Sequence, residues 1–181
     1  MIDEKCGAQV TITGMNHAIH EGIAFTCCLS TAKDAFDTGS PMSFFLTTPD
    51  SEMHPHIQIH GSANVAAILE IFEDNGVAAQ FDVSGGTVVV PANKDRNSSN
   101  VSVMTVTHTP TITAATVEAR IHGRFAGKAG SHPSFEFVLK RNTKYLFKFT
   151  SLDDDNEGSL NIDWCERADR AFAGAVGTVE Q

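Results

Sequence analysis

Alternating apolar and polar positions over short segments are the main regularity of this chain. In His56–His60 the two isoleucines fall on one face of a strand, and the histidines and Gln58 fall on the other. In Tyr145–Thr150 the tyrosine and the two phenylalanines alternate with Leu146 and Lys148 in the same way. A period of two residues is the side-chain period of a β-strand. Both segments are therefore predicted to be strands that turn one face to the core.

Further strands are expected between clusters of turn-forming Gly, Pro, Asn and Asp residues. Ala18–Leu29 is interpreted as a strand pair or as one bent strand with its bend at Gly22. The other predicted strands are Val10–Thr13, Ser43–Thr48, Val65–Phe72, Val77–Val83, Thr87–Val90, Val101–Thr107, Val117–Ile121, Phe135–Leu139 and Leu160–Trp164. The predicted turns are Ser84–Gly86, Pro91–Asn100, Thr109–Thr113, Gly123–Pro133 and Asp153–Gly158, with a longer connector at Ser30–Pro41.

One segment, Val65–Phe72, has the composition of a helix, but it is short and a turn cluster follows it directly. We interpret it as a strand. About ten short strands without a long amphipathic helix predict an all-β fold, an antiparallel β-sandwich that is jelly-roll-like. The expected organisation is an N-terminal arm or first strand in residues 1–16, a β-sandwich domain in 17–167 and a C-terminal tail in 168–181.

The length and composition argue against some classes of partner. The 181 residues are 41% hydrophobic, enough for the core of one domain, and carry a net charge of −9. A nonspecific nucleic-acid binder usually has a basic excess, so we expect no nucleic-acid partner. No apolar run approaches the roughly 20 residues that cross a bilayer, and the N-terminus lacks a secretory signal pattern, so we expect no membrane partner.

The charge is distributed unevenly along the chain. Thr111–Thr150 holds seven bases and two acids, a net charge of +5, which leaves −14 for the remaining residues. Such a division suits packing against further copies of the chain or against an acidic partner. Solvated strand faces explain it equally well.

The four cysteines do not form a recognisable framework. Cys27 and Cys28 are neighbours, so in a strand they point to opposite faces and are poorly placed to bridge each other. No CxxC spacing occurs, which argues against a zinc knuckle. With Cys6 and Cys165, they are expected to be reduced and partly buried thiols.

Two segments have the residue types of metal ligands. His54, His56 and His60 would share one face of a strand, as in a cupin-type metalloenzyme, but Gly61 stands where such a site needs a glutamate. The acidic run Asp153–Gly158 resembles half of a calcium loop, yet the spacing of an EF-hand is not met. Hydrogen-bonded or surface histidines and a solvated hairpin turn are the favoured interpretations.

Catalytic motifs are missing from the sequence. It contains no GxSxG, P-loop or GxGxxG pattern, so we expect a protein that is not an enzyme, with no catalytic, cofactor-binding or metal-binding residue. Trp164, the single tryptophan, is predicted to lie in the core rather than at a contact. The loop Asn93–Asn97 is expected to fix backbone groups through Asn and Arg hydrogen bonds or simply to form a turn.

Seven segments occur together in an order that resembles a group of small tailed-bacteriophage virion proteins. They are AIHEGIAF (18–25), FFLTTPD (44–50), LEIFED (69–74), ANKDRNSSN (92–100), THTPTIT (107–113), FEFVLKRNTKYLFKFTS (135–151) and LNIDWCE (160–166). The resemblance covers about His17 to Glu166. One departure is Cys165, where the family pattern usually has tyrosine.

The resemblance implies a capsid decoration or cement protein, a viral structural protein that binds the outside of the assembled capsid. The implied partners are the major capsid protein and further copies of the chain, commonly in a homotrimer. The implied location is the outer capsid surface of the virion, after synthesis in the host cytoplasm. Two alternatives stay open: a tail-associated or receptor-binding, glycan-binding sandwich, and a cupin-like metalloenzyme that uses His54, His56 and His60.

Overall fold

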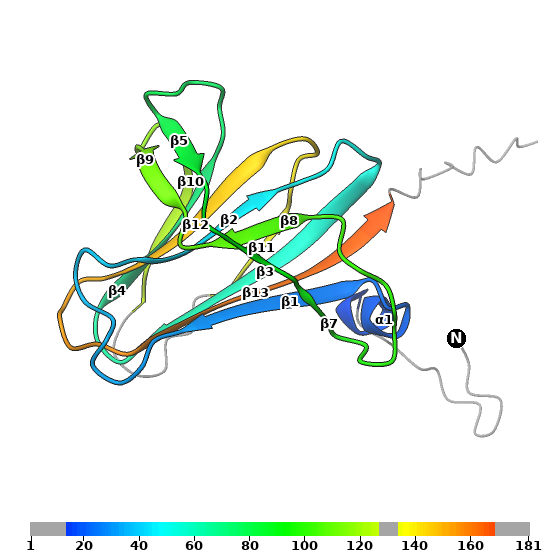
Figure 1. Ribbon diagram of the computed structural model, residues 1–181, viewed down its shortest axis with the longest axis horizontal. Coiled ribbons are helices and arrows are strands. Elements are labelled where there is room, and N and C mark those ends of the chain that lie inside the picture. The colour runs from blue at the N-terminus through cyan, green and yellow to red at the C-terminus, as the bar shows by residue number, and fades with distance from the viewer. Residues whose placement is uncertain (1–13, 127–133, 169–181) are drawn as a thin grey trace, which may run out of the picture.

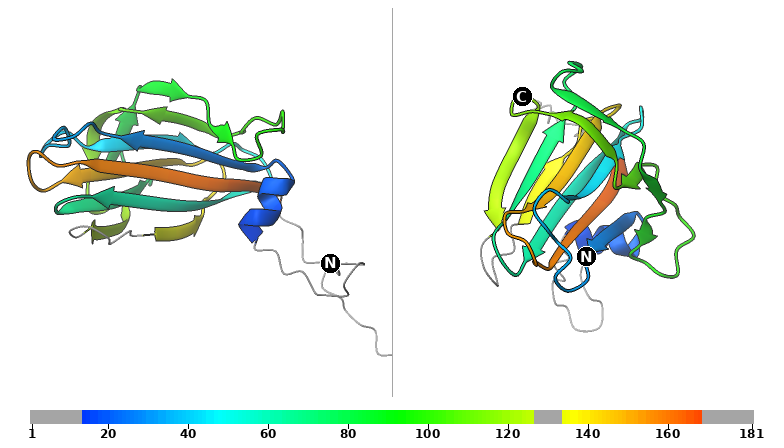
Figure 2. Two further views of the ribbon diagram at one scale, coloured as in Figure 1. Left: turned by 90° about the horizontal axis from the view of Figure 1, so that it is seen from below. Right: turned by 60° about the vertical axis from the view of Figure 1, so that its left-hand side comes forward.

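Two antiparallel sheets packed face to face form the body of the protein in a computed structural model (Figure 1), which describes residues 14–126 and 134–168. The first sheet contains, in spatial order, β11 (Ser134–Val138), β3 (Met53–Ala63), β13 (Gly158–Ala168), β1 (Ala24–Ser30) and β7 (Ala92–Asn93). The second contains β10 (Arg120–Ala126), β4 (Ala67–Glu73), β12 (Lys144–Ser151), β2 (Met42–Thr47), β8 (Thr105–His108) and β6 (Thr87–Val89). Figure 2 shows the two layers edge on.

The strand order is that of a jelly roll. The main strands of the described chain are β1 to β4 and β10 to β13, and consecutive members of each set alternate between the sheets. Numbered one to eight along the chain, they lie in the order 1-8-3-6 in the first sheet and 2-7-4-5 in the second. The predicted all-β, antiparallel, jelly-roll-like sandwich is confirmed.

The segment between β4 and β10 extends this frame. Its strands β6 and β8 lengthen the second sheet beyond β2, and β7 lengthens the first sheet beyond β1. Its other two strands, β5 (Phe81–Ser84) and β9 (Thr111–Ala115), form a separate two-stranded sheet. This small sheet covers Phe72 and Leu146 on the outer face of the second sheet, where Phe81, Val83 and Ala119 are also buried. The second sheet therefore has apolar contacts on both faces.

Aromatic side chains fill the space between the sheets. Tyr145, Phe147 and Phe149 of β12 are at most 1% exposed, as the alternation in this segment predicts. Trp164 is also fully buried, which confirms its predicted place in the core, and its ring lies 6.0 Å from that of Phe25. A fully buried large apolar side chain stabilises a fold by about 1.5–3 kcal/mol, so these rings are a main source of stability.

The segment from Ala18 to Leu29 differs from its prediction. Residues Gly14–His20 form the helix α1, the chain turns at Gly22 with a φ of 68°, and β1 begins only at Ala24. Met15, Ala18 and Ile19 have the spacing of one helical face, and they pack on Ala24 and Cys165. Three apolar positions are too few to distinguish this period from a strand pattern. The predicted N-terminal arm or first strand thus ends in a helix, while Val10–Thr13 lies outside the described residues.

Several predicted boundaries were also wrong. Val101–Thr107 becomes extended only at Thr105, Val77–Val83 only at Phe81 and Val117–Ile121 only at Arg120. Conversely, parts of three predicted turns lie in strands: Ala92–Asn93, residues 111–113 and residues 123–126. In each of these the strand state comes from pairing with a distant segment, as when β10 pairs along the whole of β4. Tertiary pairing overrides local composition at such positions.

Replacing Gly158 by alanine should destabilise the protein by about 1–3 kcal/mol, the usual cost of overpacking a core. A Cβ at this position would lie 2.6 Å from Cδ1 of Phe36 and 2.8 Å from Cε of Met42. Phe36 cannot easily move, because its ring packs against Phe149 at 5.3 Å between centroids. Urea denaturation would measure the loss. Gly123→Ala is the matched control, since its new Cβ would meet only the flexible side chain of Arg120 at 3.4 Å; equal midpoints for the two variants would contradict the packing argument.

Candidate functional site

The three histidines of the candidate metal site lie on the outer face of β3. Ile57 and Ile59 are fully buried on the inner face, as predicted, and the histidines alternate with them. His56 and His60 are four residues apart along the strand, which corresponds to roughly 13 Å, so the three imidazoles do not converge. In residues 14–126 and 134–168, no group of three His, Cys, Asp or Glu side chains is placed to hold a metal ion. The described residues therefore do not form the set of ligands that a cupin-like metal centre on these histidines would need.

The acidic run Asp153–Gly158 forms the connection between β12 and β13. The carboxylate of Asp154 accepts hydrogen bonds from the backbone N–H and the hydroxyl of Thr38, at 3.0 and 2.6 Å, and these bonds lower its pKa. Asp37 in turn accepts a hydrogen bond from the N–H of Asp155 at 3.0 Å. The acids thus bind the connector between β1 and β2 to this connection, which crosses between the two sheets and is not the hairpin that was expected.

Asn156 is the buried centre of the same end of the sandwich. Its side-chain oxygen accepts hydrogen bonds from the N–H groups of Asn64, Val65 and Glu157 at 2.8–3.1 Å. Its side-chain nitrogen donates to the hydroxyl of Ser151 at 2.9 Å. Its backbone carbonyl accepts from Ala35 and Phe36. One buried asparagine therefore joins main-chain groups of three connections.

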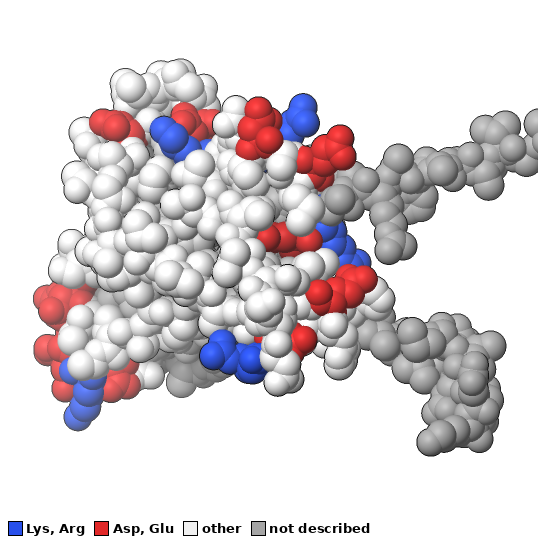
Figure 3. Space-filling model, turned by 45° about the vertical axis from the view of Figure 1, so that its right-hand side comes forward, with Lys and Arg blue, Asp and Glu red and all other residues white. Residues whose placement is uncertain are grey.

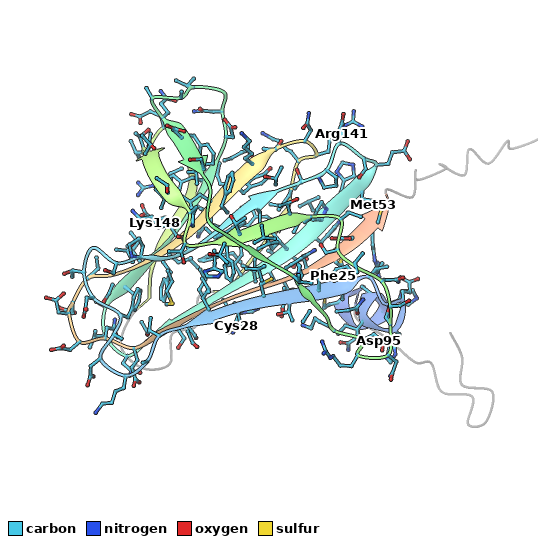
Figure 4. The ribbon with its side chains drawn as sticks, viewed as in Figure 1. Phe25, Cys28, Met53, Asp95, Arg141 and Lys148 are labelled. Carbon is cyan, nitrogen blue, oxygen red and sulfur yellow. The ribbon has the colours of Figure 1, made fainter. Side chains whose placement is uncertain are left out.

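The loop after β7 is fixed at its base by Asn93. The side-chain nitrogen of this buried residue donates to the carbonyl oxygens of Gly22 at 2.8 Å and Asn100 at 3.1 Å, and its side-chain oxygen accepts from the N–H of Asp95. Asn100 donates to the Gly22 carbonyl as well, at 3.1 Å. The loop lies beside α1, where Asp95 is labelled in Figure 4. The expected backbone-fixing role belongs mainly to Asn93; Arg96 adds one long contact to the Asn93 carbonyl at 3.4 Å.

Glu166 is a buried carboxylate that sequence reasoning missed. It is 3% exposed, and it accepts hydrogen bonds from Ser102 Oγ at 2.5 Å, Trp164 Nε1 at 3.0 Å and the N–H of Val103 at 3.1 Å. It therefore attaches the segment before β8 to the end of β13. The signal was present in the alternation, because Leu160, Ile162, Trp164 and Glu166 share the inner face of one strand. A carboxylate on an apolar strand face must find donors inside the protein.

Another group of hydrogen bonds joins β2, β4 and β12 at one end of the second sheet. Thr48 donates to the Lys140 carbonyl at 2.7 Å and accepts from the N–H of Thr143 at 2.9 Å. The Tyr145 hydroxyl accepts from the N–H of Lys140 at 2.9 Å and donates to Glu73 at 3.1 Å. Burial raises the pKa of this hydroxyl, so the tyrosine stays neutral and remains a donor.

The two aromatic residues best suited to stacking on sugars are both inside the protein. The chain has one tryptophan and one tyrosine, and Trp164 and Tyr145 are at most 1% exposed. The polar ends of both side chains are used by Glu166 and Glu73, as described above. Neither ring can act as a platform for a glycan on the surface of this fold.

Strand β4 supplies acidic partners to part of the basic segment. This strand lies between β10 and β12, which both belong to the basic stretch, and it carries Glu70 and Glu73. Glu70 pairs with Arg120 at 2.8 Å and lies 3.9 Å from Lys148, and Glu73 pairs with Lys140. Three of the seven bases in Thr111–Thr150 thus have a carboxylate partner from outside that stretch. Part of the charge division along the sequence is therefore offset by ion pairs to β4, two of them across neighbouring strands.

The described cysteines are free thiols with different environments. Cys27 is buried and Cys28 is exposed, as their adjacent positions on one strand predict, and Cys165 is buried against α1. Burial is the main cause that raises the pKa of Cys27 from 9.0 to about 12, and burial also raises the pKa of Cys165. Cys6 lies outside the described residues.

The described surface also has a shallow polar depression of about 280 Å³. It is lined by Thr47, Asp74, Gly76, Asn142, Thr143 and Lys144. The carboxylate of Asp74 accepts the N–H of Gly76 at 2.9 Å, and the Asp74 N–H donates to the Lys144 carbonyl. These groups already satisfy one another and form a turn.

Comparison with protein family models, with curated proteins and with solved structures found no match to this chain. No helix among residues 14–126 and 134–168 has the length and apolar character needed to cross a bilayer.

Glu166→Ala should cost about 1–3 kcal/mol, because it leaves the buried Trp164 Nε1–H without its acceptor and removes the partner of Ser102 and Val103. Glu166→Gln keeps one acceptor oxygen and should cost less. Urea denaturation measures both losses, and faster amide exchange at Val103 would place the effect in the attached loop. Glu52→Ala, at an exposed position, is the control; a Glu166→Ala variant as stable as this control would disprove the anchoring role.

In a Cys6→Ser background, a thiol reagent at pH 8 should modify one cysteine of the folded protein quickly. That residue is Cys28, because it is exposed, whereas the raised pKa of Cys27 keeps its reactive thiolate scarce. Mass spectrometry after brief labelling would identify the site. Unfolding in urea should expose Cys27 and Cys165 to the same reagent, and equal labelling of all three before unfolding would contradict the described burial.

Proposed function

We propose that this protein is a non-enzymatic capsid decoration protein of a tailed bacteriophage. It binds the outer surface of the assembled capsid and stabilises the contacts between major capsid subunits. The order of seven sequence segments between His17 and Glu166 supports this proposal, because it resembles that of small phage virion proteins. A protein of this kind acts by binding the assembled state in preference to the dissociated one, and it needs no reaction centre.

The observation that carries the proposal is the role of those segments in the structure. Each supplies side-chain or backbone groups that join distant parts of the frame. The hydrogen-bonding residues are Gly22, Thr48, Glu73, Asn93, Thr107, Tyr145 and Glu166, one from each segment. What the segments have in common is therefore that they join the loops of the jelly roll to its frame by hydrogen bonds. Such a body loses little conformational entropy when it binds across a subunit boundary.

The jelly-roll fold is compatible with a capsid decoration protein, but it does not distinguish this function from the alternatives. Jelly rolls occur in viral capsid domains, in lectins and in cupins, so the fold class alone does not assign a function. The lectin-like alternative loses its aromatic platform, because Trp164 and Tyr145 are buried. The cupin-like alternative would need convergent ligands, and His54, His56 and His60 lie along the outer face of β3. A capsid decoration role requires neither an exposed aromatic platform nor convergent histidines.

Co-sedimentation with empty shells tests the proposal. The shells are assembled from the major capsid protein of the phage that encodes this chain and are prepared without the present protein. We expect saturable binding at a fixed ratio to the capsid subunit, much weaker binding to free subunits, and shells that resist a higher temperature once the protein is bound. Shells already saturated with unlabelled protein are the control for nonspecific capture.

Equal binding to free subunits and to shells would contradict the proposal. The absence of binding, together with recovery of the protein on purified tails, would assign it to the adsorption apparatus instead.

A further inference from the structure

Strand β6 and the residue that follows it carry two of the most exposed apolar side chains of the described surface. Val88 is 69% exposed and Val90, which directly follows the strand, is 84% exposed, whereas Val89 between them packs against the core. We call Thr87–Val90 the β6 ribbon. Two further exposed valines, Val101 at 77% and Val103 at 49%, lie in the segment that leads into β8, the pairing partner of β6. Isolated exposed valines are ordinary, but four on two adjoining segments indicate a contact surface.

Charged residues are missing from both segments in the sequence. Residues 83–93 and 97–117 contain no Asp, Glu, Lys or Arg, although such residues make up 19% of the chain. The space-filling view in Figure 3 shows one face of the molecule with a broad uncharged middle and most of its acidic and basic side chains toward the borders. Depletion of charge is the compositional mark of the centre of a protein interface.

The β6 ribbon is also an open sheet edge. β6 is the last strand of the second sheet, and among the described strands it pairs only with β8. Its outward main-chain groups are therefore available to a further strand. Natural proteins commonly protect such an edge by keeping it short, or with a charged residue or a proline within the strand. β6 is short and Pro91 follows it, but Thr87, Val88 and Val89 carry no charge.

The ribbon is held in place at both ends. At its start, Gly86 has a φ of 97°, and a Cβ there would lie 2.8 Å from the His108 carbonyl, so only glycine permits this close approach to β8. The Thr107 hydroxyl donates to the Gly85 carbonyl at 3.3 Å. At its far end the chain enters β7, where Asn93 is anchored to Gly22. An edge that is already ordered loses little entropy when it acquires a partner.

We propose that the β6 ribbon is the surface through which two copies of this chain associate. Each copy has a net charge of −9, so association is least opposed where the surface carries no charge. An acidic end of the molecule, with Asp37 and Asp154, would instead repel its counterpart. The β6 ribbon is suited to pair with the same ribbon of a second copy, because threonine and valine favour antiparallel strand pairs. A stable interface needs about 800 Å² from each partner, so the contact has to include exposed residues beside the ribbon such as Val101 and Val103.

The test uses the purified full chain without capsid, so its outcome is independent of the proposed decoration role. Light scattering and sedimentation equilibrium should show an oligomer that dissociates on dilution. The double variant Val88→Lys and Val90→Lys should weaken association by about 100-fold, because it places like charges opposite each other at the contact. Val138→Lys is the matched control, since Val138 is a 56% exposed valine on the edge strand β11; it should associate like the unchanged protein.

Amide exchange on the unchanged protein supplies a second measurement that does not depend on how the variants fold. Exchange at Thr87–Val90 should slow as the protein concentration rises. A chain that is monomeric at all concentrations, or a double variant that associates like the control, would overturn the proposal. If the chain is monomeric and the double variant fails to bind shells, the ribbon contacts the capsid and the self-association proposal is wrong.

Discussion

The satisfaction of main-chain polar groups where the chain crosses between the two sheets is the constraint on which this structure depends. Consecutive main strands lie in different sheets, so almost every connection passes over an end of the sandwich. Backbone N–H and C=O groups in such connections lose water and need partners. Asn156, Asn93 and Glu166 supply them from buried side chains that each accept or donate several hydrogen bonds. The aromatic core supplies stability, and these three residues determine where the loops lie.

The sequence predicted those strands that bury one face in the core and turn the other face outward. The alternation around Ile57 and around Phe147 identified both the strands and the faces that they bury. It failed for α1, where three apolar residues are compatible with either period, and for β10, whose Gly123 and polar neighbours are extended because β4 pairs with them. Such pairing joins residues about fifty positions apart, and no local pattern contains that information.

The buried polar residues were harder to foresee than the core. Asn93 and Asn156 lie in segments with the composition of solvated turns, and only their distant partners distinguish them from ordinary turn residues. The candidate metal site failed for a related reason: His54, His56 and His60 share a face, as the alternation predicts, but that face is the outer one and the three are spread along the strand. A set of suitable residue types becomes a site only if the fold makes the side chains converge.

The strand order has a consequence for how the protein is made. None of the first four main strands pairs with another of these four: β1 pairs with β13 and β7, β2 with β12 and β8, β3 with β11 and β13, and β4 with β10 and β12. During synthesis the N-terminal half therefore emerges as strands whose partners do not yet exist. Folding of both sheets has to wait for residues 144–168, and until then apolar strands stay exposed to other chains. A protein with this topology depends on its last strands to remain soluble as it is made.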